Sequence, residues 1–340
     1  MKNKKNGISY AKYGYLFSIP FVLTFLIFTL YPIIYTVIIS FTNLKGAFAS
    51  GFTLANPWYK NFKAILTNQN FLTGLKNTFV IWIMNFIPQM ILALVLAAWF
   101  SNDGNGIKGK GFFKVIFYMP NIITAASIAI LFGALFAYPT GPINDLLTKT
   151  LGFDRPFNFP QSKWAAKIIV AFIQFWMWYG YTMIILNSGI LGISPDIFEA
   201  AEIDGANGAQ KFFKITLPNL KTIMLFTLVT SLIGGLQMFD IPQLYLNGGP
   251  DNSTLTASVF IYNQAFRNQY RYALGAAASM IMFIIIAALS AVIFFMLRDK
   301  DEAKFAKMEK ERIKAYNKQQ KEAKKAAQIA AASAETKEAE

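Results

Sequence analysis

Few side chains in this sequence could catalyse a reaction or bind a metal. Histidine and cysteine are absent, so the usual general base at neutral pH, thiol nucleophiles and the commonest metal ligands are all missing. Residues 104–111, GNGIKGKG, have the glycine spacing of a phosphate-binding loop as far as Lys110, but Gly111 stands where a Ser or Thr would hold magnesium. The sequence therefore predicts no catalytic residue, no metal site and no cofactor bound by this chain.

Aromatic and neutral polar residues gather in two apolar stretches. In the first, QFWMWYGYTM, four residues with i, i+3, i+4, i+7 spacing share one helical face: Trp176, Tyr179, Gly180 and Met183. The second stretch contributes Ser231, Gly235, Gln237 and Met238. Aromatic faces and neutral hydrogen-bonding groups are what a carbohydrate requires, so the two clusters are candidate sugar contacts. The same residue types are also typical of helix packing and of membrane interfaces, and for each single residue both interpretations stay open.

Long uncharged stretches indicate that a membrane positions these residues. The 340 residues are 55% hydrophobic and 16% aromatic, which is high for a soluble protein. Six segments of 18 to 27 residues lack Asp, Glu, Lys and Arg: 15–41, 78–100, 115–138, 168–193, 222–239 and 273–297. A bilayer core of about 30 Å needs about 20 apolar helical residues. The sequence predicts an all-α polytopic membrane protein with six transmembrane helices, the first retained as an anchor.

None of these segments contains the ionisable residue that a proton- or sodium-coupled transporter usually keeps inside the membrane. This weakens the case for secondary transport and for a channel gated by buried charge. A carbonyl-lined pore stays open as an interpretation.

The distribution of basic residues predicts the orientation. Loops on the side of the two termini carry 22 Lys and Arg, and the opposite loops carry 10, so both termini are expected in the cytoplasm. Twelve of the 22 follow Leu297; without them each side carries 10, spread over 56 residues on the terminal side and 98 on the other. The formal net charge of +14 is therefore distributed around the membrane segments and the tail. No single basic face with stacking aromatics is formed, so no nucleic-acid partner is expected.

The polar segment after the fourth hydrophobic stretch is more than a short turn. Ser194 can cap a first helix, PDIFEAAEI, which has proline at its first position and acidic residues near its start. Gly205 permits a bend, and a second helix, NGAQKFFKI, is expected to end before Pro218. The sequence predicts a rigid L-shaped element on the cytoplasmic side.

This segment resembles the EAA loop of ABC importer permeases. Glu-Ala-Ala, three residues, Gly, nine residues, and Ile-x-Leu-Pro match that pattern position by position. The resemblance implies that the loop docks into a cleft on an ATP-binding subunit and transmits closure of the ATPase dimer to the membrane helices. ATP and magnesium would then bind in the partner subunits. The residues carried over to this coupling role are Glu199, Ala200, Ala201, Asp204, Gly205, Ile215, Leu217 and Pro218.

Other stretches narrow the resemblance to the carbohydrate-uptake branch, of the maltose and oligosaccharide type. GKGFFKVIFYMP resembles the start of its third core helix, GPINDLL an outer loop, and LNGGPDNSTLT the outer turn after its fifth helix. The resemblance implies the first permease of an unlike pair in a bacterial plasma membrane. Its implied partners are a second permease subunit, two ATP-binding cassette subunits, an extracellular sugar-binding protein and a carbohydrate substrate.

The chain divides into a cytoplasmic N-terminus (1–14), a six-helix transmembrane domain (15–297) that contains the coupling loop (194–218), and a charged cytoplasmic tail (298–340). The tail has a sparse apolar stripe that could meet a partner or the membrane surface: Phe305, Met308, Ile313 and Tyr316. A solvated helix is the other interpretation of the tail. The alternative function is a partner-independent channel or facilitator, in which the coupling loop is only structural.

Overall fold

The computed structural model describes residues 11–46, 51–101, 108–267, 270–297, 308–320 and 322. Within these ranges the regular structure is helical, apart from one antiparallel bridge between Thr42 and Leu54. The first half contains α1 (Ala11–Phe25), α2 (Tyr31–Ser40), α3 (Lys60–Leu66), α4 (Gln69–Ser101), α5 (Lys110–Ile122), α6 (Ala125–Leu135) and α7 (Pro142–Asp145). The second half contains α8 (Lys163–Leu191), α9 (Pro195–Ile203), α10 (Gly208–Lys211), α11 (Leu217–Asn219), α12 (Lys221–Leu236), α13 (Asp240–Leu246), α14 (Ala257–Tyr262) and α15 (Tyr272–Leu297). Short π or 3-10 turns join them: η1 (Leu26–Leu30), η3 (Leu146–Thr150), η4 (Phe159–Gln161), η5 (Phe212–Thr216) and η6 (Asn263–Arg267).

The described part of the chain has five helices that are long and apolar enough to cross a membrane. They are Lys12–Ser40, Gln69–Ser101, Lys163–Leu191, Lys221–Leu246 and Tyr272–Leu297. A sixth span is possible if α5 and α6 count as one bent crossing. The predicted class, an all-α polytopic membrane protein, is confirmed.

The third predicted segment, 115–138, is not one straight helix in the structure. α5 and α6 meet at an angle of 90°. The backbone is extended at Ile123 and Thr124, and the Thr124 side chain caps α6 by accepting a hydrogen bond from the Ser127 N–H at 3.2 Å. The bend follows because this cap begins a new helix where the apolar pattern simply continues.

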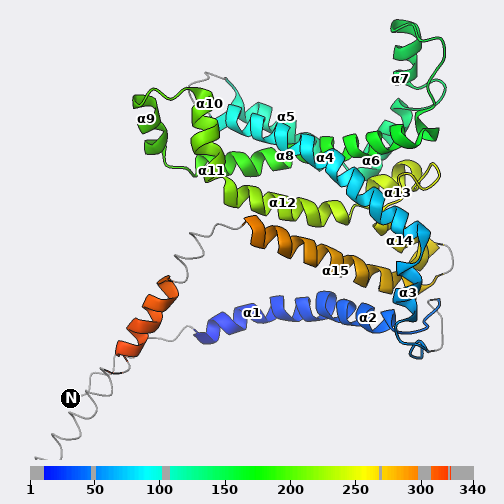
Figure 1. The fold of residues 1–340 in the computed structure, drawn as a ribbon, viewed down its shortest axis with the longest axis horizontal. Helices are drawn as coiled ribbons and strands as arrows, with labels where there is room; N and C mark the ends of the chain where they lie inside the picture. The colour runs from blue at the N-terminus through cyan, green and yellow to red at the C-terminus, as the bar shows by residue number, and fades with distance from the viewer. Residues whose placement is uncertain are drawn as a thin grey trace, which may run out of the picture.

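The short helices outside the long spans lie in two groups, at opposite ends of the molecule (Figure 1). The helices of the coupling loop, α9 to α11, lie at the same end as the start of α1 and the last residues of α15. The short helices α7, α13 and α14 lie at the opposite end. This arrangement agrees with an even total number of crossings, counted from α1 to α15 with both included.

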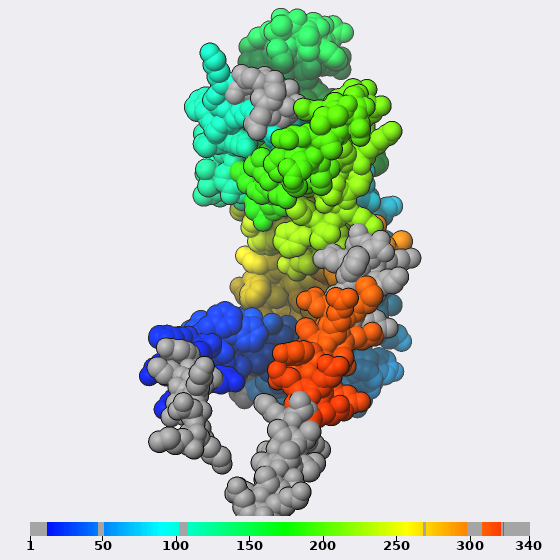
Figure 2. Space-filling view, turned by 90° about the vertical axis from the view of Figure 1, so that its left-hand side faces the viewer, coloured from blue at the N-terminus to red at the C-terminus, as the bar shows by residue number. Residues whose placement is uncertain are grey.

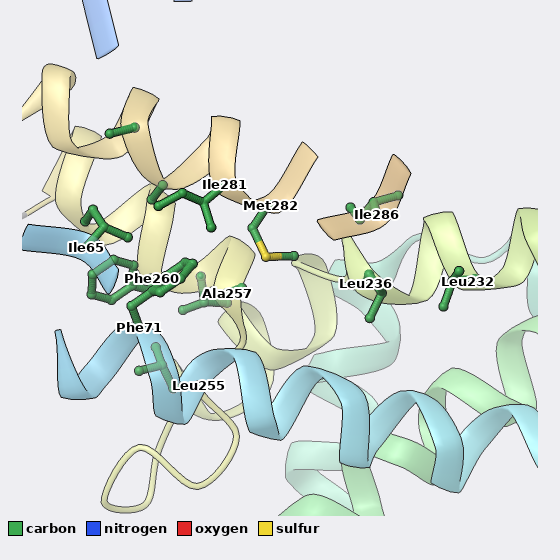
Figure 3. Close-up of a cluster of buried hydrophobic side chains, with 13 residues drawn as sticks. Ile65, Phe71, Leu232, Leu236, Leu255, Ala257, Phe260, Ile281, Met282 and Ile286 are labelled. Atoms are coloured by element: carbon green, nitrogen blue, oxygen red, sulfur yellow. The ribbon is translucent and has the colours of Figure 1, made fainter. Parts of the chain in front are cut away.

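Close side-chain packing joins α4, α12, α14 and α15. Figure 3 shows Phe71 of α4 beside Phe260 of α14, with ring centroids 5.5 Å apart. The same buried cluster includes Leu232 and Leu236 of α12 with Ile281, Met282 and Ile286 of α15. Because lipid is as apolar as these side chains, close contact between helices contributes more here than escape from water.

A second close approach joins α8 to α5. Gly180 of α8 lies so near the backbone of α5 that a Cβ at this position would be 2.0 Å from the Phe117 carbonyl oxygen. Only glycine fits such an approach without a shift of one helix. The contact fixes how the bent α5 and α6 pair stands against α8.

Candidate functional site

The first arm of the coupling loop is α9, whose bounds coincide with the predicted PDIFEAAEI helix. Two backbone hydrogen bonds end it, from the Gly205 N–H to the Glu202 oxygen and from the Ala206 N–H to the Ala201 oxygen. This is a Schellman motif, and it requires the left-handed conformation found at Gly205, where φ is 73°. The predicted bend at Gly205 is therefore present and has a defined geometry.

The second arm is held by a capping box and an ion pair. Asn207 accepts from the Gln210 N–H at 2.9 Å, and the Gln210 side chain accepts from the Asn207 N–H at 2.8 Å. Lys211 of this arm pairs with Glu202 of α9 at 2.8 Å. These contacts join the two arms into one L-shaped unit.

Two details of the loop differ from the sequence-based expectation. Ser194 lies at the N-cap, but its hydroxyl donates to Asp196 at 3.2 Å instead of accepting from the backbone. The second arm does not end before Pro218, because the π-turn η5 leads directly into α11. Proline is tolerated there since it occupies the first turn of α11, where its missing N–H would lack an intrahelical partner anyway.

The coupling loop presents apolar side chains outward. Ile203 at the end of α9 is 87% exposed, and Phe213 of the second arm is 65% exposed. α9 contains no buried residue. Figure 2 looks onto this end of the molecule and shows the loop on its surface, in bright green to yellow-green. An exposed apolar surface on a rigid, polar-edged element is typical of a protein-binding site.

A cleft of about 410 Å³ separates the loop from the ends of α4 and α8. Its lining includes Glu199, Glu202 and Lys211 from the loop and Ser101 and Ile190 from the bundle. The loop and the ends of α4 and α8 therefore face each other across this cleft.

Next to this cleft, a polar network connects three helices. Lys114 of α5 donates to the Asn187 side-chain oxygen of α8 at 2.7 Å, and Asn187 donates to Ser101 of α4 at 2.6 Å. Asn187 is 5% exposed and also donates to the Ala97 carbonyl at 3.2 Å. The network ties the bundle together at the end that faces the coupling loop.

A second hollow, here called the polar cavity, has a volume of about 360 Å³ and lies among α4, α8, α12 and α13. Most of its lining residues are neutral hydrogen-bonding or aromatic. Those from α4 and α8 are Trp82, Asn85, Gln89, Gln174, Met177, Trp178, Tyr181 and Thr182. Those from α12, α13 and their junction are Thr227, Thr230, Ser231, Gly234, Gly235, Gln237, Met238, Phe239, Asp240 and Ile241, and α6 adds Ala125.

The structure places all four candidate residues of the second stretch at the wall of this cavity: Ser231, Gly235, Gln237 and Met238. Ser231 accepts a hydrogen bond of 3.4 Å from the Trp82 indole. Gly235 lies against the same indole, since a Cβ there would be 2.0 Å from Trp82 Cδ1. The missing side chain of Gly235 thus makes room for Trp82 and not for an empty space.

The four candidates of the first stretch do not line the polar cavity. Tyr179 and Met183 are buried in a cluster with α4 residues, and Trp176 packs against Phe132 with ring centroids 5.7 Å apart. Gly180 is occupied by its contact with α5. In this chain these four residues form a helix-packing face, outside the cavity that the second stretch lines.

The opposite face of α8 faces the cavity instead, through Gln174, Trp178, Tyr181 and Thr182. Aromatic residues occur on both faces, so composition could not tell them apart. Gln174 and Thr182 could have identified the cavity-facing side of α8, because a hydrogen-bonding side chain in an apolar helix usually faces protein or water and not lipid. The same signal marks Asn85 and Gln89 on α4, which the sequence analysis missed; Gln89 donates to Thr182 at 2.8 Å.

An all-helical bundle with a polar cavity among its spans, and an exposed helical loop at one end, defines a polytopic membrane transport protein. The chain belongs to the family of binding-protein-dependent transport system inner membrane components, whose model matches residues 65–300. The sequence-based resemblance to ABC importer permeases of the carbohydrate-uptake branch is confirmed.

Relatives agree with this assignment over most of the chain. The lactose transport system permease protein LacF of Rhizobium radiobacter is 30% identical over 84% of this chain and 94% of its own length. The arabinooligosaccharides transport system permease protein AraP of Bacillus subtilis (strain 168) is 32% identical over 82% and 86%. A chain of a bacterial alginate ABC transporter, solved with alginate pentasaccharide-bound periplasmic protein, has a TM-score of 0.70 at 23% identity and covers 84% of this chain and 93% of its own. At that identity the likeness concerns the fold.

Proposed function

We propose that this chain is the permease subunit of an ATP-driven carbohydrate importer in a bacterial plasma membrane. It forms the sugar path together with a second permease subunit. Two ATP-binding cassette subunits bind and hydrolyse ATP with magnesium, and an extracellular binding protein delivers the sugar. The sugar relatives LacF and AraP support carbohydrate as the substrate class.

The observation that carries the proposal is the rigid, outward-facing coupling loop. Its two arms are tied by the Schellman motif and the Glu202–Lys211 ion pair, so a force on α9 moves both arms together. Ile203 and Phe213 offer apolar surface to a partner. The loop continues through α11 into α12, which forms one wall of the polar cavity. A connected path therefore runs from the ATPase-docking surface to the sugar.

We assign a role to each residue according to its place along this path. ATPase docking and transmission belong to Glu199, Ala200, Ala201, Asp204, Gly205, Ile215, Leu217 and Pro218. Sugar contact belongs to the cavity wall, through Ser231, Gly235, Gln237 and Met238 with the newly located Trp82, Asn85, Gln89 and Trp178. Both termini are proposed to be cytoplasmic, because the loop that would meet the ATPases lies at the same end of the bundle as the start of α1 and the last residues of α15.

Co-assembly tests the proposal. The chain is reconstituted in liposomes alone, and with the second permease and ATPase subunits of its own transport system. We expect sugar uptake only in the complete assembly, with ATP inside the compartment that faces the ATPases and with the binding protein on the other side. Uptake by the chain alone without ATP would instead establish a partner-independent facilitator.

A further inference from the structure

The wall of the polar cavity has one charged side chain among its described residues. This is Asp240, the first residue of α13, and its side chain is exposed. No ion pair within the described part of the chain includes it. The cavity therefore contains a carboxylate without a described basic partner.

The basic residues of the helices around the cavity lie outside its wall. Lys76 of α4 and Lys221 of α12 are each six residues, about 9 Å along the helix, from the cavity residues Trp82 and Thr227. Lys167 lies about 10 Å along α8 from Gln174, and its Nζ is 5.3 Å from the Trp164 ring centroid. Lys163 pairs with Asp251 at 3.1 Å, and Lys114 donates to Asn187. None of these five lysines lines the cavity.

The remaining polar wall suits uncharged groups. Its amides, at Asn85, Gln89, Gln174 and Gln237, donate and accept hydrogen bonds, as sugar hydroxyls do. A carboxylate on a sugar only accepts. Moving it from water into this cavity without a cation would be costly, and Asp240 would add repulsion between like charges.

We infer that this cavity takes carbohydrates without acidic groups and that Asp240 rejects uronates and other anionic sugars. The inference rests on the proposed function, since it assumes that the polar cavity is the sugar site. The fold alone does not set the charge of the substrate: a chain with this fold belongs to a transporter involved in the import of the acidic polysaccharide alginate. The selecting feature is the cavity wall.

The charge of the cavity can be measured directly because the chain has no cysteine. Gln237→Cys in the full chain, in lipid nanodiscs, places one thiol at the wall, three residues before Asp240. Its rates of reaction with a cationic and an anionic methanethiosulfonate reagent are compared with those of free cysteine. We expect the cationic reagent to be favoured by about threefold or more at low ionic strength. Adding Asp240→Asn should remove that preference, whereas the ratio at the exposed control Ser188→Cys should not respond to Asp240→Asn. A Gln237→Cys ratio that equals free cysteine, or that ignores Asp240→Asn, overturns the inference.

Protection of a thiol at Gly234→Cys by sugars separates this inference from the proposed function. Gly234 lines the cavity, has nothing within 4 Å of a Cβ, and is not one of the proposed sugar contacts. Lactose, raffinose and digalacturonate are tested at equal concentration against modification by a neutral methanethiosulfonate. We expect a neutral sugar to slow the reaction and digalacturonate to have no effect, with some protection by digalacturonate appearing in the Asp240→Asn background. Equal protection by digalacturonate in the parent overturns the charge selection while the sugar site stands. Protection by none of the sugars contradicts the sugar site itself, and the inference falls with it.

Discussion

Gly234 and Gly235 are adjacent in α12 but have different surroundings. A Cβ at Gly235 would lie 2.0 Å from Trp82 Cδ1, whereas nothing lies within 4 Å of a Cβ at Gly234. We predict that Gly235→Ala displaces the Trp82 indole, lowers the free energy of unfolding by about 1–3 kcal/mol through overpacking, and impairs uptake. Gly234→Ala should be neutral or stabilise the helix by up to about 1 kcal/mol.

Thermal unfolding in detergent and the tryptophan emission spectrum check this pair of variants. A double variant with Trp82→Ala provides the control, because it removes the group that a new methyl would strike. If Gly235→Ala is as harmful in the Trp82→Ala background as in the parent, the contact with Trp82 is not the cause.

Variants of Tyr179 and Gln237 distinguish a residue that packs between helices from one that lines the cavity. Tyr179 is 8% exposed and packs in the cluster shared by α4 and α8, whereas Gln237 is exposed at the cavity wall. We predict that Tyr179→Ala lowers the free energy of unfolding by about 3–5 kcal/mol. Gln237→Ala should change it by less than about 0.5 kcal/mol yet reduce ATP-driven uptake. A stable Tyr179→Ala protein with selectively impaired uptake would return Tyr179 to the sugar site.

For single residues, the sequence identified which residue types could bind a sugar better than it identified the side of the helix on which they lie. Ser231 and Gln237 reach the cavity as expected, because hydrogen-bonding groups in an apolar helix are constrained to face protein or water. Trp176 and Trp178 could not be separated in this way. They lie about 200° apart around the helix axis, and an indole is stable in packing, in a cavity or at the interface. The structure separates them because Gly180 packs against the α5 backbone. This contact turns the Trp176 face of α8 toward its packing partners and leaves Trp178 at the cavity.

The coupling loop depends on one backbone conformation, that of Gly205 with φ of 73°. We predict that Gly205→Pro abolishes ATP-driven uptake and retention of the ATPase subunits. Proline fixes φ near −65° and removes the N–H that bonds to Glu202, so the first arm would end in another direction. Membrane insertion should be unchanged, since the spans are not altered.

Gly208→Pro is the matched control for this variant. Gly208 is the first residue of α10, where proline is favoured, and Asn207 before it is already extended, with φ of −75° and ψ of 169°. Uptake and co-purification of the ATPases are measured for both variants. Normal coupling in Gly205→Pro, or its equal loss in Gly208→Pro, would contradict a role for the bend.

Helices with a local start or stop signal were predictable as elements. Pro at the start and Gly after the end set α9 within its observed bounds. The bend between α5 and α6 has only a weak local signal, because Thr124 is a single possible N-cap within an uncharged segment and Pro120 lies inside α5. Its cause is the Thr124 cap together with packing of α6 on α13, a contact that forms only in the assembled bundle.

The whole molecule unites spans that differ greatly in how much of their surface they bury. Of the most apolar window of each candidate span, 56% is buried in Lys163–Leu191 but only 6% in Lys12–Ser40. Both are long apolar stretches in the sequence, although Lys163–Leu191 is the less apolar of the two. Lipid and protein are similar solvents for apolar side chains, so hydropathy marked both as candidate spans without showing how much of each is buried in the bundle.

The C-terminal tail is expected to be dispensable at the scale of the whole molecule. Residues 308–320 are helical, and Phe305 of the predicted stripe lies outside the described residues. The other members, Met308, Ile313 and Tyr316, are 43%, 53% and 61% exposed. The hydrogen bond and ion pair described for this helix, Gln320 to Tyr316 and Lys318 to Glu322, are internal.

We therefore predict that truncation after residue 305 preserves folding, assembly and ATP-driven uptake. The control is truncation after residue 280, which removes Ile281, Met282 and Ile286 from the cluster that joins α15 to α4 and α12. That variant should fail to fold, because several buried side chains are lost at once, each at a cost of about 2–5 kcal/mol. Size-exclusion chromatography, co-purification and uptake are compared for the two variants. A chain shortened after residue 305 that inserts and folds normally but no longer retains its ATPases would show that the tail, together with the coupling loop, is part of the docking surface.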